Sequence, residues 1–253
     1  MIPPFQTTFA VPLSCESCIK DLSTSLYKID GIQHLHFSLP HQTVTTTGTT
    51  PPTLILRAIH STGRDAILRG SGAPNSTAVC ILETHAPSAD RVRGLARMVQ
   101  VAPGLTVVDL TVRGLKEGTY WATVRETGDV SRGAASVGGV WGEVVEAAEG
   151  RPRQRMRKGV LGTLEVSKAG VGSVFVDRPV QVWEMIGRSM VVSKVAPPRE
   201  GGAKEAFEAE DPDTVVGVIA RSAGVWENDK TVCSCSGKTV WEEREEQRGK
   251  GML

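Results

Sequence analysis

The first 70 residues alternate between strand-like and helix-like hydrophobic patterns. Apolar residues from Cys15 onward recur every three or four positions, as on one face of a helix, and a β-branched run follows further along. The predicted elements, in order, are a strand (5–11), a helix (15–31), two strands (32–39 and 43–47), a helix (51–63) and a strand (66–68). This βαββαβ order predicts a ferredoxin-like domain over residues 1–70.

A different pattern begins after a segment with the composition of a linker. Residues 71–76 are rich in Gly, Ser and Pro, and we expect the domain boundary there. Between Thr77 and Ser222 helical periodicity is weak and turns are frequent. The predicted strands are 78–83, 96–101, 105–112, 119–125, 162–166, 172–177, 189–195 and 215–220. Many short strands with turns between them predict an antiparallel sandwich or barrel over residues 77–222.

Three segments carry no clear period. Residues 197–213 are rich in Pro, Gly and acids and are expected to form a long loop, and the basic segment 151–158 to form a solvated one. Residues 223–253 are too few for a core of their own. We expect them to form an irregular C-terminal tail, flexible or docked on another surface.

Composition limits the classes of partner. The chain has 253 residues, enough for two compact domains and a tail, and 29 Lys and Arg balance 28 Asp and Glu to a net charge of +1. This balance gives no bulk field for nucleic acid or a membrane surface. No apolar run approaches the roughly 18 residues of a membrane span, and the first residues lack a signal core. We therefore expect no membrane insertion and a reducing, intracellular location.

Two of the five cysteines stand at the junction of a strand and a helix, in Cys15-Glu-Ser-Cys18. A helix N-terminus favours the thiolate form, so at least one thiol should ionise easily. Two thiolates at this spacing can bind one soft ion, and with only two ligands Cu(I) fits better than a four-coordinate structural zinc. His34 and His36 do not complete such a zinc site. The alternative is a redox pair like that of thioredoxin.

A tighter pair, Cys233-Ser-Cys235, lies in the tail. Side chains two positions apart point to the same side of an extended chain, so both sulfurs can share a soft cation. A disulfide across one residue would be strained and would exchange readily with a thiol of another protein. The alternative is two incidental exposed cysteines. Cys80 lies inside an apolar run and is expected to be a small buried hydrophobe.

The order of these features resembles the copper chaperones for superoxide dismutase, and the fungal form in particular. A Cys-x-x-Cys domain precedes a β-rich domain, which precedes a Cys-x-Cys tail, and the likeness covers nearly the whole chain. It is carried by residues 128–133, 186–194, 217–224, 224–228 and 237–244. One residue departs from the family motif, because Leu13 stands where Met is usual, a position whose side chain is thought to pack inward.

The resemblance implies a Greek-key barrel similar to copper/zinc superoxide dismutase but without its metals. That enzyme binds copper and zinc with histidines and an aspartate, whereas His85 is the one histidine between Thr77 and Ser222. The corresponding ligand positions are Thr123, Arg125, Val140, Val160 and Ser193, which cannot hold two metals. The positions of the enzyme's intrasubunit disulfide correspond to Ala134 and Val216. No dismutase activity is therefore expected.

The resemblance also implies a function. The protein would be a metallochaperone that binds Cu(I) on Cys15 and Cys18, docks on newly made copper/zinc superoxide dismutase as a heterodimer, and promotes formation of the client's intrasubunit disulfide. Cys233 and Cys235 would serve that transfer and also bind copper. The expected partner surface matches the enzyme's dimer contacts at Gly128, Asp129, Trp183, Gly187, Arg188, Val218, Ile219, Ala220 and Arg221.

Other readings stay open at this point. A general thiol-disulfide oxidoreductase would accept many clients, a copper-buffering protein would form no heterodimer, and a divergent dismutase would consume superoxide. The resemblance places the protein in the cytoplasm and leaves open the mitochondrial intermembrane space, a homodimer and a copper transporter as a further partner.

Overall fold

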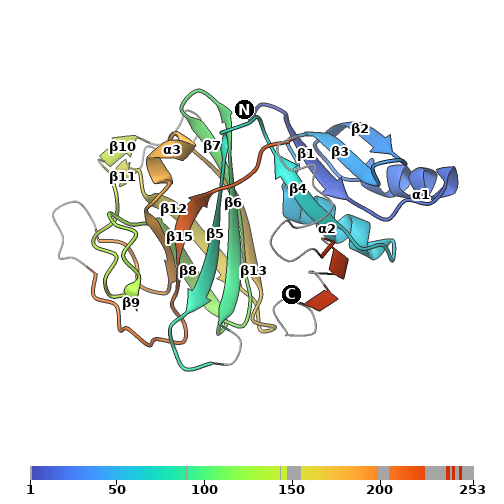
Figure 1. The fold of residues 1–253 in the computed structure, drawn as a ribbon. Coiled ribbons are helices and arrows are strands. Elements are labelled where there is room, and N and C mark those ends of the chain that lie inside the picture. The colour runs from blue at the N-terminus through green and yellow to red at the C-terminus, as the bar shows by residue number, and fades with distance from the viewer. Residues whose placement is uncertain are drawn as a thin grey trace.

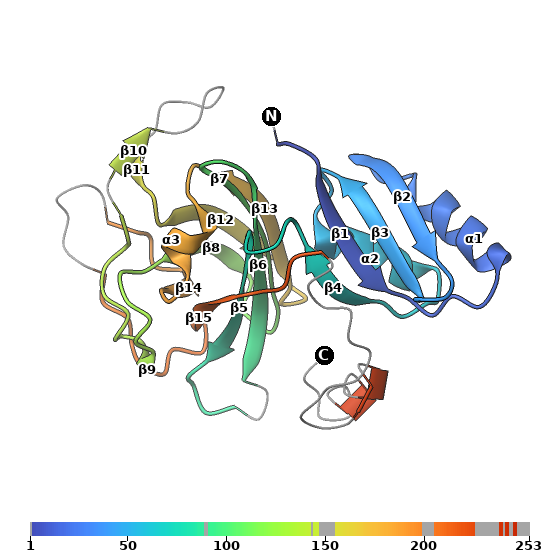
Figure 2. The same cartoon turned by 45° about the horizontal axis from the view of Figure 1, so that its top comes forward.

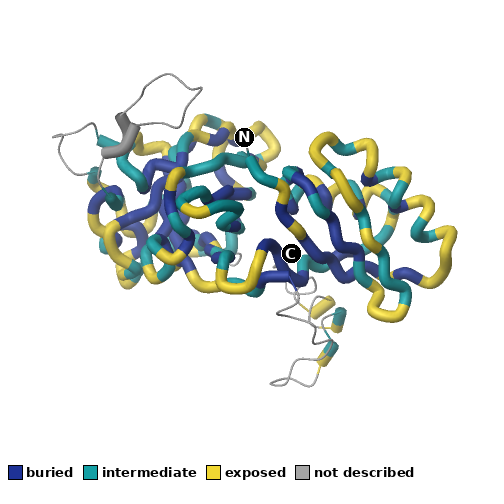
Figure 3. Tube along the Cα trace, turned by 90° about the horizontal axis from the view of Figure 1, so that it is seen from above, coloured by how far each residue is buried: buried dark blue, intermediate teal, exposed yellow. Residues whose placement is uncertain are grey.

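The computed structural model of the chain describes residues 2–88, 91–142, 144–146, 155–198 and 205–225, and the short pairs 238–239, 241–242 and 245–246. For residues 144–146, 155 and 156 it describes the backbone alone. Two bodies lie side by side, a small sheet with helices and a larger barrel (Figure 1). Each body has its own buried interior (Figure 3).

The N-terminal body is an antiparallel sheet packed against two helices. Its elements are β1 (Phe5–Ala10), α1 (Glu16–Leu26), β2 (Ile32–Ser38), β3 (Thr43–Gly48), α2 (Pro52–Ser61) and β4 (Ile67–Ser71). The strand order is β2-β3-β1-β4. The core between sheet and helices includes Phe9, Leu22, Leu26, Val44, Ile55 and Ile59. The predicted ferredoxin-like βαββαβ fold is confirmed.

Two predicted boundaries in this body differ from the structure. Helix α1 ends at Leu26, before the expected stop at Gly31, whose φ of +89° instead allows the turn into β2. Strand β4 continues to Ser71, so the first residue of the predicted linker 71–76 belongs to the sheet. Gly72 is also buried and donates its N–H to the carbonyl of Gln6 at 2.7 Å. The connection between the two bodies is therefore short and fixed at its start.

Residues 77–221 contain a closed eight-stranded barrel. Its strands are β5 (Thr77–Thr84), β6 (Val92–Ala102), β7 (Leu105–Val112), β8 (Gly118–Val124), β12 (Val160–Val166), β13 (Gly172–Arg178), β14 (Ser189–Ser193) and β15 (Val215–Arg221). They close in the order β12-β13-β7-β6-β5-β15-β14-β8. The connections from β7 to β8 and from β13 to β14 cross to non-neighbouring strands, which confirms the Greek-key barrel. All eight predicted strands are present.

Four short elements were not predicted from the sequence. They are β9 (Ser131–Ala134), the paired strands β10 (Val144–Glu146) and β11 (Arg155–Arg157), and α3 (Val182–Met185). Elements of three or four residues are too short to show a hydrophobic period. The expectation of a solvated loop at 151–158 is wrong for its second half, because β11 pairs with β10 and Lys158 Nζ lies 3.3 Å from Glu184 Oε1. No helix in the described ranges is long and apolar enough to cross a membrane.

The N-terminal body covers the outer wall of the barrel at β6, β7 and β13. Val107 alternates with core residues of β7 and so faces outward, yet it is only 2% exposed. Phe5 of β1 packs against Val99 and Val107, with Val101 and Phe175 at the edge of the cluster. Figure 2 shows β1 and β4 facing this wall. The two bodies therefore share an apolar contact rather than a tether alone.

A buried carboxylate fixes the same contact with directional bonds. Asp109 of β7 is 3% exposed, and its Oδ2 accepts hydrogen bonds from the N–H and the hydroxyl of Thr53 at 2.8 and 2.7 Å. Thr53 lies in the first turn of α2, where N–H groups lack helical partners. Burial lowers the pKa of Arg97, and the nearby charge of Asp109 opposes that shift. The barrel thus supplies the N-terminal cap of a helix in the other body.

Replacing Asp109 by Ala should destabilise the whole chain. The change removes both acceptor contacts of Thr53 and leaves Arg97 buried without its carboxylate, which we expect to lower the free energy of unfolding by about 3 kcal/mol. Urea unfolding measures the change. Glu165→Gln is the control, because Glu165 is exposed and its bond from Thr119 can be kept by an amide, so its effect should stay within about 0.5 kcal/mol. Equal effects of the two substitutions would contradict the role of Asp109.

Candidate metal centre and docking surface

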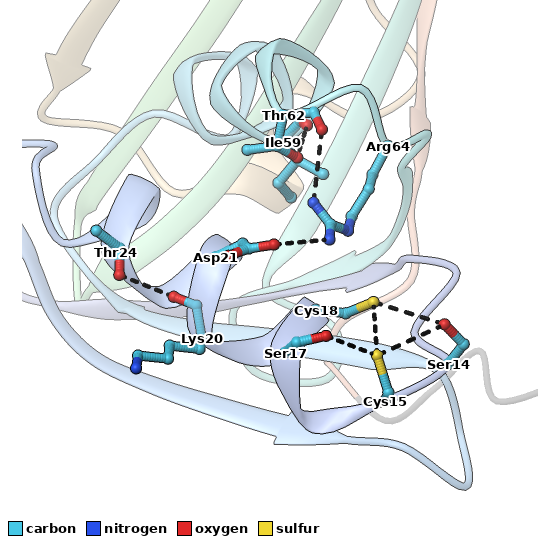
Figure 4. A network of polar contacts seen from close by, with 10 residues as sticks. All are labelled: Ser14, Cys15, Ser17, Cys18, Lys20, Asp21, Thr24, Ile59, Thr62 and Arg64. Carbon is cyan, nitrogen blue, oxygen red and sulfur yellow. Dashed lines mark hydrogen bonds and ion pairs between the residues drawn. The ribbon is translucent and has the colours of Figure 1, made fainter.

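The Cys-x-x-Cys motif brings two sulfur atoms together at the start of α1. Cys15 is the N-cap residue of this helix, and Cys18 lies one turn further on. Their Sγ atoms are 3.4 Å apart. Cys15 is exposed and Cys18 half-buried, so an ion can reach both. Figure 4 shows the sulfurs facing each other between Ser14 and Ser17. The predicted convergence of two thiols is present.

Polar neighbours stabilise the thiolate form of Cys18. Its pKa is lowered from 9.0 to about 6, chiefly by the hydroxyl of Ser14 and then by the guanidinium of Arg64. Arg64 reaches the site from the loop after α2 and also pairs with Asp21, Nη2 to Oδ2, at 3.4 Å (Figure 4). From the sequence, the helix N-terminus alone predicts that a thiol of this motif ionises easily. The structure adds a cation that lies 46 positions away in the chain, which spacing alone could not find.

An apolar residue anchors the loop that carries Cys15 to the core of the N-terminal body. Leu13 is 3% exposed and belongs to the core of the N-terminal body. The inward packing expected at this position is therefore provided by Leu in place of Met. Cys15 and Cys18 could hold a soft metal ion, for which sulfur ligands are preferred.

Of the three remaining cysteines, the structure describes Cys80 alone. Cys80 is fully buried in the barrel core, and burial raises its pKa to about 12, which confirms the predicted small hydrophobe. Cys233 and Cys235 lie outside the described residues, so their predicted roles stay predictions.

One of the barrel positions expected to correspond to a dismutase metal ligand holds an arginine that forms a buried ion pair. Register pairs Thr123 with Val160, and an isolated bridge joins Arg125 to Val140. The Arg125 guanidinium is fully buried and donates to both carboxylate oxygens of Glu205 at 3.1 Å. The ring of Phe207 lies 4.8 Å from the guanidinium carbon. A guanidinium has no lone pair to offer a metal ion, so this residue cannot act as a ligand.

The loop that carries Glu205 and Phe207 also packs over the positions that correspond to the enzyme's disulfide. Ala134 and Val216 pack in one apolar cluster with Val191, and Phe207 covers its edge. Ser193 is buried and its hydroxyl accepts the N–H of Val195 at 3.3 Å. Among the described residues, no three His, Cys, Asp or Glu side chains form a metal-binding group.

The expected partner surface gathers on α3, β15 and the turn between α3 and β14. Trp183 is 63% exposed and Val218 40% exposed, which is unusual for such large apolar side chains. Gly128 fits against this turn so closely that a Cβ there would lie 2.3 Å from the carbonyl oxygen of Gly187. Gly187 has a φ of +83°, a backbone conformation that favours glycine. Asp129 is part of the same edge, and its pKa is lowered by hydrogen bonds from Ser131.

Not every residue of the predicted surface can touch a partner with its side chain. Ile219 is 1% exposed and belongs to the barrel core, because alternate residues of β15 face inward. The Ile219 side chain is therefore not available to a partner, although its backbone bonds Gly187 and Arg188. Ala220 and Arg221 are exposed, and Arg221 Nη1 donates to Asn75 Oδ1 at 2.7 Å.

Sequence patterns missed two features of this surface. Ile81 of β5 is 52% exposed, and the register that pairs Ile219 with Cys80 places Val218 opposite it. A hollow of about 460 Å³ beside Trp183 is lined by Glu126, Trp141, Glu184, Ile186, Gly187 and Arg188. Arg188 stacks on Trp141 at 4.8 Å and donates to the carbonyls of Glu184 and Glu126. Alternation within β5 could have placed Ile81 outside. The hollow required the folded loops.

Comparison with known proteins identifies two domain families. Residues 8–65 match the heavy-metal-associated domain, and residues 92–203 match copper/zinc superoxide dismutase. The chain is 43% identical to the superoxide dismutase 1 copper chaperone of Debaryomyces hansenii, with 100% of this chain and 99% of that one covered. Its counterparts in Saccharomyces cerevisiae (40%, covering 96% and 95%) and Candida glabrata (39%, covering 96% and 94%) are also similar over nearly their full lengths.

Replacing Arg64 by Met should make Cys18 harder to ionise. The lowered pKa means that Cys18 is largely thiolate at pH 7 and becomes protonated as the pH falls through about 6. Without the guanidinium we expect this midpoint to rise by about one unit. The alkylation rate of Cys18 against pH, followed by mass spectrometry of its peptide, measures the shift. Arg57→Met, on the exposed face of α2, is the matched control and should leave the midpoint unchanged. An unchanged midpoint in Arg64→Met would contradict the assignment.

Proposed function

Because the chain belongs to the copper chaperones for superoxide dismutase, we propose that it carries Cu(I) on Cys15 and Cys18, docks on a newly made dismutase subunit and matures it. The membership makes the chain a metallochaperone and not an enzyme, and copper is its cargo. The observation that carries the proposal is the combination of an accessible two-thiol site with a dismutase-like barrel in which one expected ligand position holds Arg125, ion-paired with Glu205.

Cargo binding needs thiolates that can release the ion again. The Cys18 thiolate is present at neutral pH, and two sulfurs make few bonds to break on transfer. Arg64 offsets part of the negative charge that two thiolates leave after binding a monovalent ion. These features support Cu(I) rather than a four-coordinate zinc, which would demand two more ligands.

Docking would use the surface around Trp183. The barrel shares its architecture with dismutase subunits, so it can present the same self-complementary contact to one of them. Trp183, Val218 and the added Ile81 supply apolar area, and the hollow beside Trp183 can receive a side chain of the partner. Gly187, Arg188, Ala220 and Arg221 complete the proposed heterodimer surface. A homodimer would use the same contact, and a copper transporter would meet the N-terminal body instead.

The tail would complete the maturation. A disulfide between Cys233 and Cys235 would be attacked by a client thiolate, so that the tail S–S bond breaks as a mixed disulfide forms. A second client thiolate would then release the tail as a dithiol and leave the client oxidised by two electrons. In this exchange the tail disulfide itself is the two-electron oxidant. Cys15 and Cys18, by contrast, can bind copper only while they are reduced, which supports the cytoplasm and, as a second location, the mitochondrial intermembrane space.

Loss of either cysteine pair should lower client activation, but the two losses should depend differently on the copper concentration. Cys233→Ser with Cys235→Ser should abolish client activation at every copper level, whereas Cys15→Ser with Cys18→Ser should reduce activation at least ten-fold when copper is scarce and little when it is abundant. Dismutase activity of a metal-free, disulfide-reduced client measures both. Cys80→Ala is the control, since Cys80 is buried. Full activation by the tail double variant would refute the role of the tail.

Charge at the docking surface should prevent pairing. Trp183→Glu would place a carboxylate in an apolar contact, and we expect the heterodimer dissociation constant to rise at least a hundred-fold. Sedimentation of mixed chaperone and client measures it. Tyr27→Glu is the matched control, because Tyr27 is 55% exposed at the end of α1 and lies away from α3. Unchanged pairing of the Trp183 variant would refute the proposed surface.

A further inference from the structure

The segment that leaves the barrel after β15 crosses to the N-terminal body. Figures 1 and 2 show it passing from β15 toward β4. We call residues 222–225 the tail root, because the chain toward Cys233 begins there. Thr77 of β5 bonds Ser222, the first residue of the root. The Ser222 N–H donates to the Thr77 carbonyl at 3.1 Å, and the Thr77 hydroxyl donates to the Ser222 carbonyl at 2.8 Å.

The other end of the tail root bonds the N-terminal body. Ser71 donates its N–H to the carbonyl of Ala223 at 3.5 Å, and Val225 donates its N–H to the carbonyl of Gly72 at 2.9 Å. Strand β4 is at the edge of its sheet, so its outer backbone groups are open to such pairing. The root therefore bonds the edge strand of the N-terminal body, although it follows a strand of the barrel.

Two glycines allow this contact. A Cβ on Gly70 would lie 2.2 Å from the carbonyl oxygen of Gly224, and a Cβ on Gly224 would lie 2.6 Å from the carbonyl oxygen of Ala73. Neither glycine has a positive φ, so what each position requires is space and not a special backbone conformation. The two backbones meet so closely that no side chain fits on either side.

The contact between the root and the N-terminal body joins backbone atoms beside a small cavity. Beneath the root lies a cavity of about 210 Å³ between the two bodies, lined in part by Arg69, Ser71 and Arg97. Ser222 and Ala223 form another part of its lining. Val225 of the root is 3% exposed, so side-chain packing holds the root together with its backbone bonds. A methyl group added at the glycine contact would still push the two backbones apart, because it would overlap a carbonyl oxygen.

We propose that the Gly70–Gly224 contact is a clamp that sets the position from which the tail thiols act. From Val225 to Cys233 the tether is eight residues long, which is at most about 29 Å of extended chain. If the root were released, the tether would begin at Arg221 and be twelve residues long, at most about 43 Å. Effective concentration falls as a tether lengthens. Gly70 and Gly224 are thus positioning residues, and this role rests on the proposed function.

Gly70→Ala and Gly224→Ala in the full chain test the clamp. Each should speed hydrogen exchange of the Val225 amide at least ten-fold, because its bond to Gly72 is lost. The Ile219 amide, which bonds Arg188 at 2.8 Å, is the internal reference and should not change. Gly139→Ala is the matched control, since its φ is ordinary and a Cβ there meets only Glu126 side-chain atoms at 3.4 Å. A Val225 amide that exchanges as fast in the wild type as in the variants would overturn the clamp.

Client activation tests the positioning role. Both variants should lower the maximal activation rate about two- to three-fold and leave the half-saturating chaperone concentration unchanged, because the docking surface is intact. Inserting four Gly/Ser residues after Trp226 lengthens the tether without touching the clamp, and it should slow activation equally while the Val225 amide stays protected. This insertion keeps the test valid if an alanine variant fails to fold.

The outcomes separate the clamp from the function on which it rests. A wild-type chain that fails to activate the client refutes the proposed function. A wild type that activates, together with glycine variants or an insertion that activate at the same rate, refutes the positioning role alone.

Discussion

Asp109 puts a carboxylate on the outer wall of a barrel strand, where an exposed acid would ordinarily meet water, and the N-terminal body covers it. Its bonds to Thr53 join the start of α2 to β7, and the apolar cluster around Phe5 extends the contact. The relative position of the two candidate sites depends on this junction. Cys15 and Cys18 lie at one end of the molecule with α1, and the surface around α3 lies at the other (Figure 1).

This separation gives each part of the chain a distinct task. A fixed N-terminal body cannot reach across to a subunit bound at the proposed docking surface while its contact with the barrel persists. The tail root lies at the junction, between the two candidate sites. Held by β4 and by Thr77, it connects the domain that carries Cys15 and Cys18 to the strand that carries Val218.

The elements were predictable from the sequence where their periods were long enough. The amphipathic face of α1 and the β-branched run of β3 marked their elements, and the eight barrel strands each carried an alternating stretch bounded by turns. The Cys-x-x-Cys spacing predicted the thiol pair because both residues belong to one helical turn. Arg64 was not predictable, since it meets Cys18 only after α2 packs against α1.

Other features depended on which side of a strand a residue faces. The family resemblance marked the segment 218–221 as a whole, and it could not separate exposed Val218 from buried Ile219. Strict alternation along β15 would have done so. Asp109 could have been predicted to have a partner, because an isolated acid in the run Val-Val-Asp-Leu indicates a contact on the outer wall. Glu205 gave no such signal, since its loop has no period.

The ion pair of Arg125 and Glu205 has a consequence for the interior of the barrel. A barrel that holds its own opposite charges, with Phe207 laid over them, reaches its native state without waiting for an ion. The barrel interior therefore keeps the same contacts whether the thiol pair at the other end of the molecule is empty or loaded.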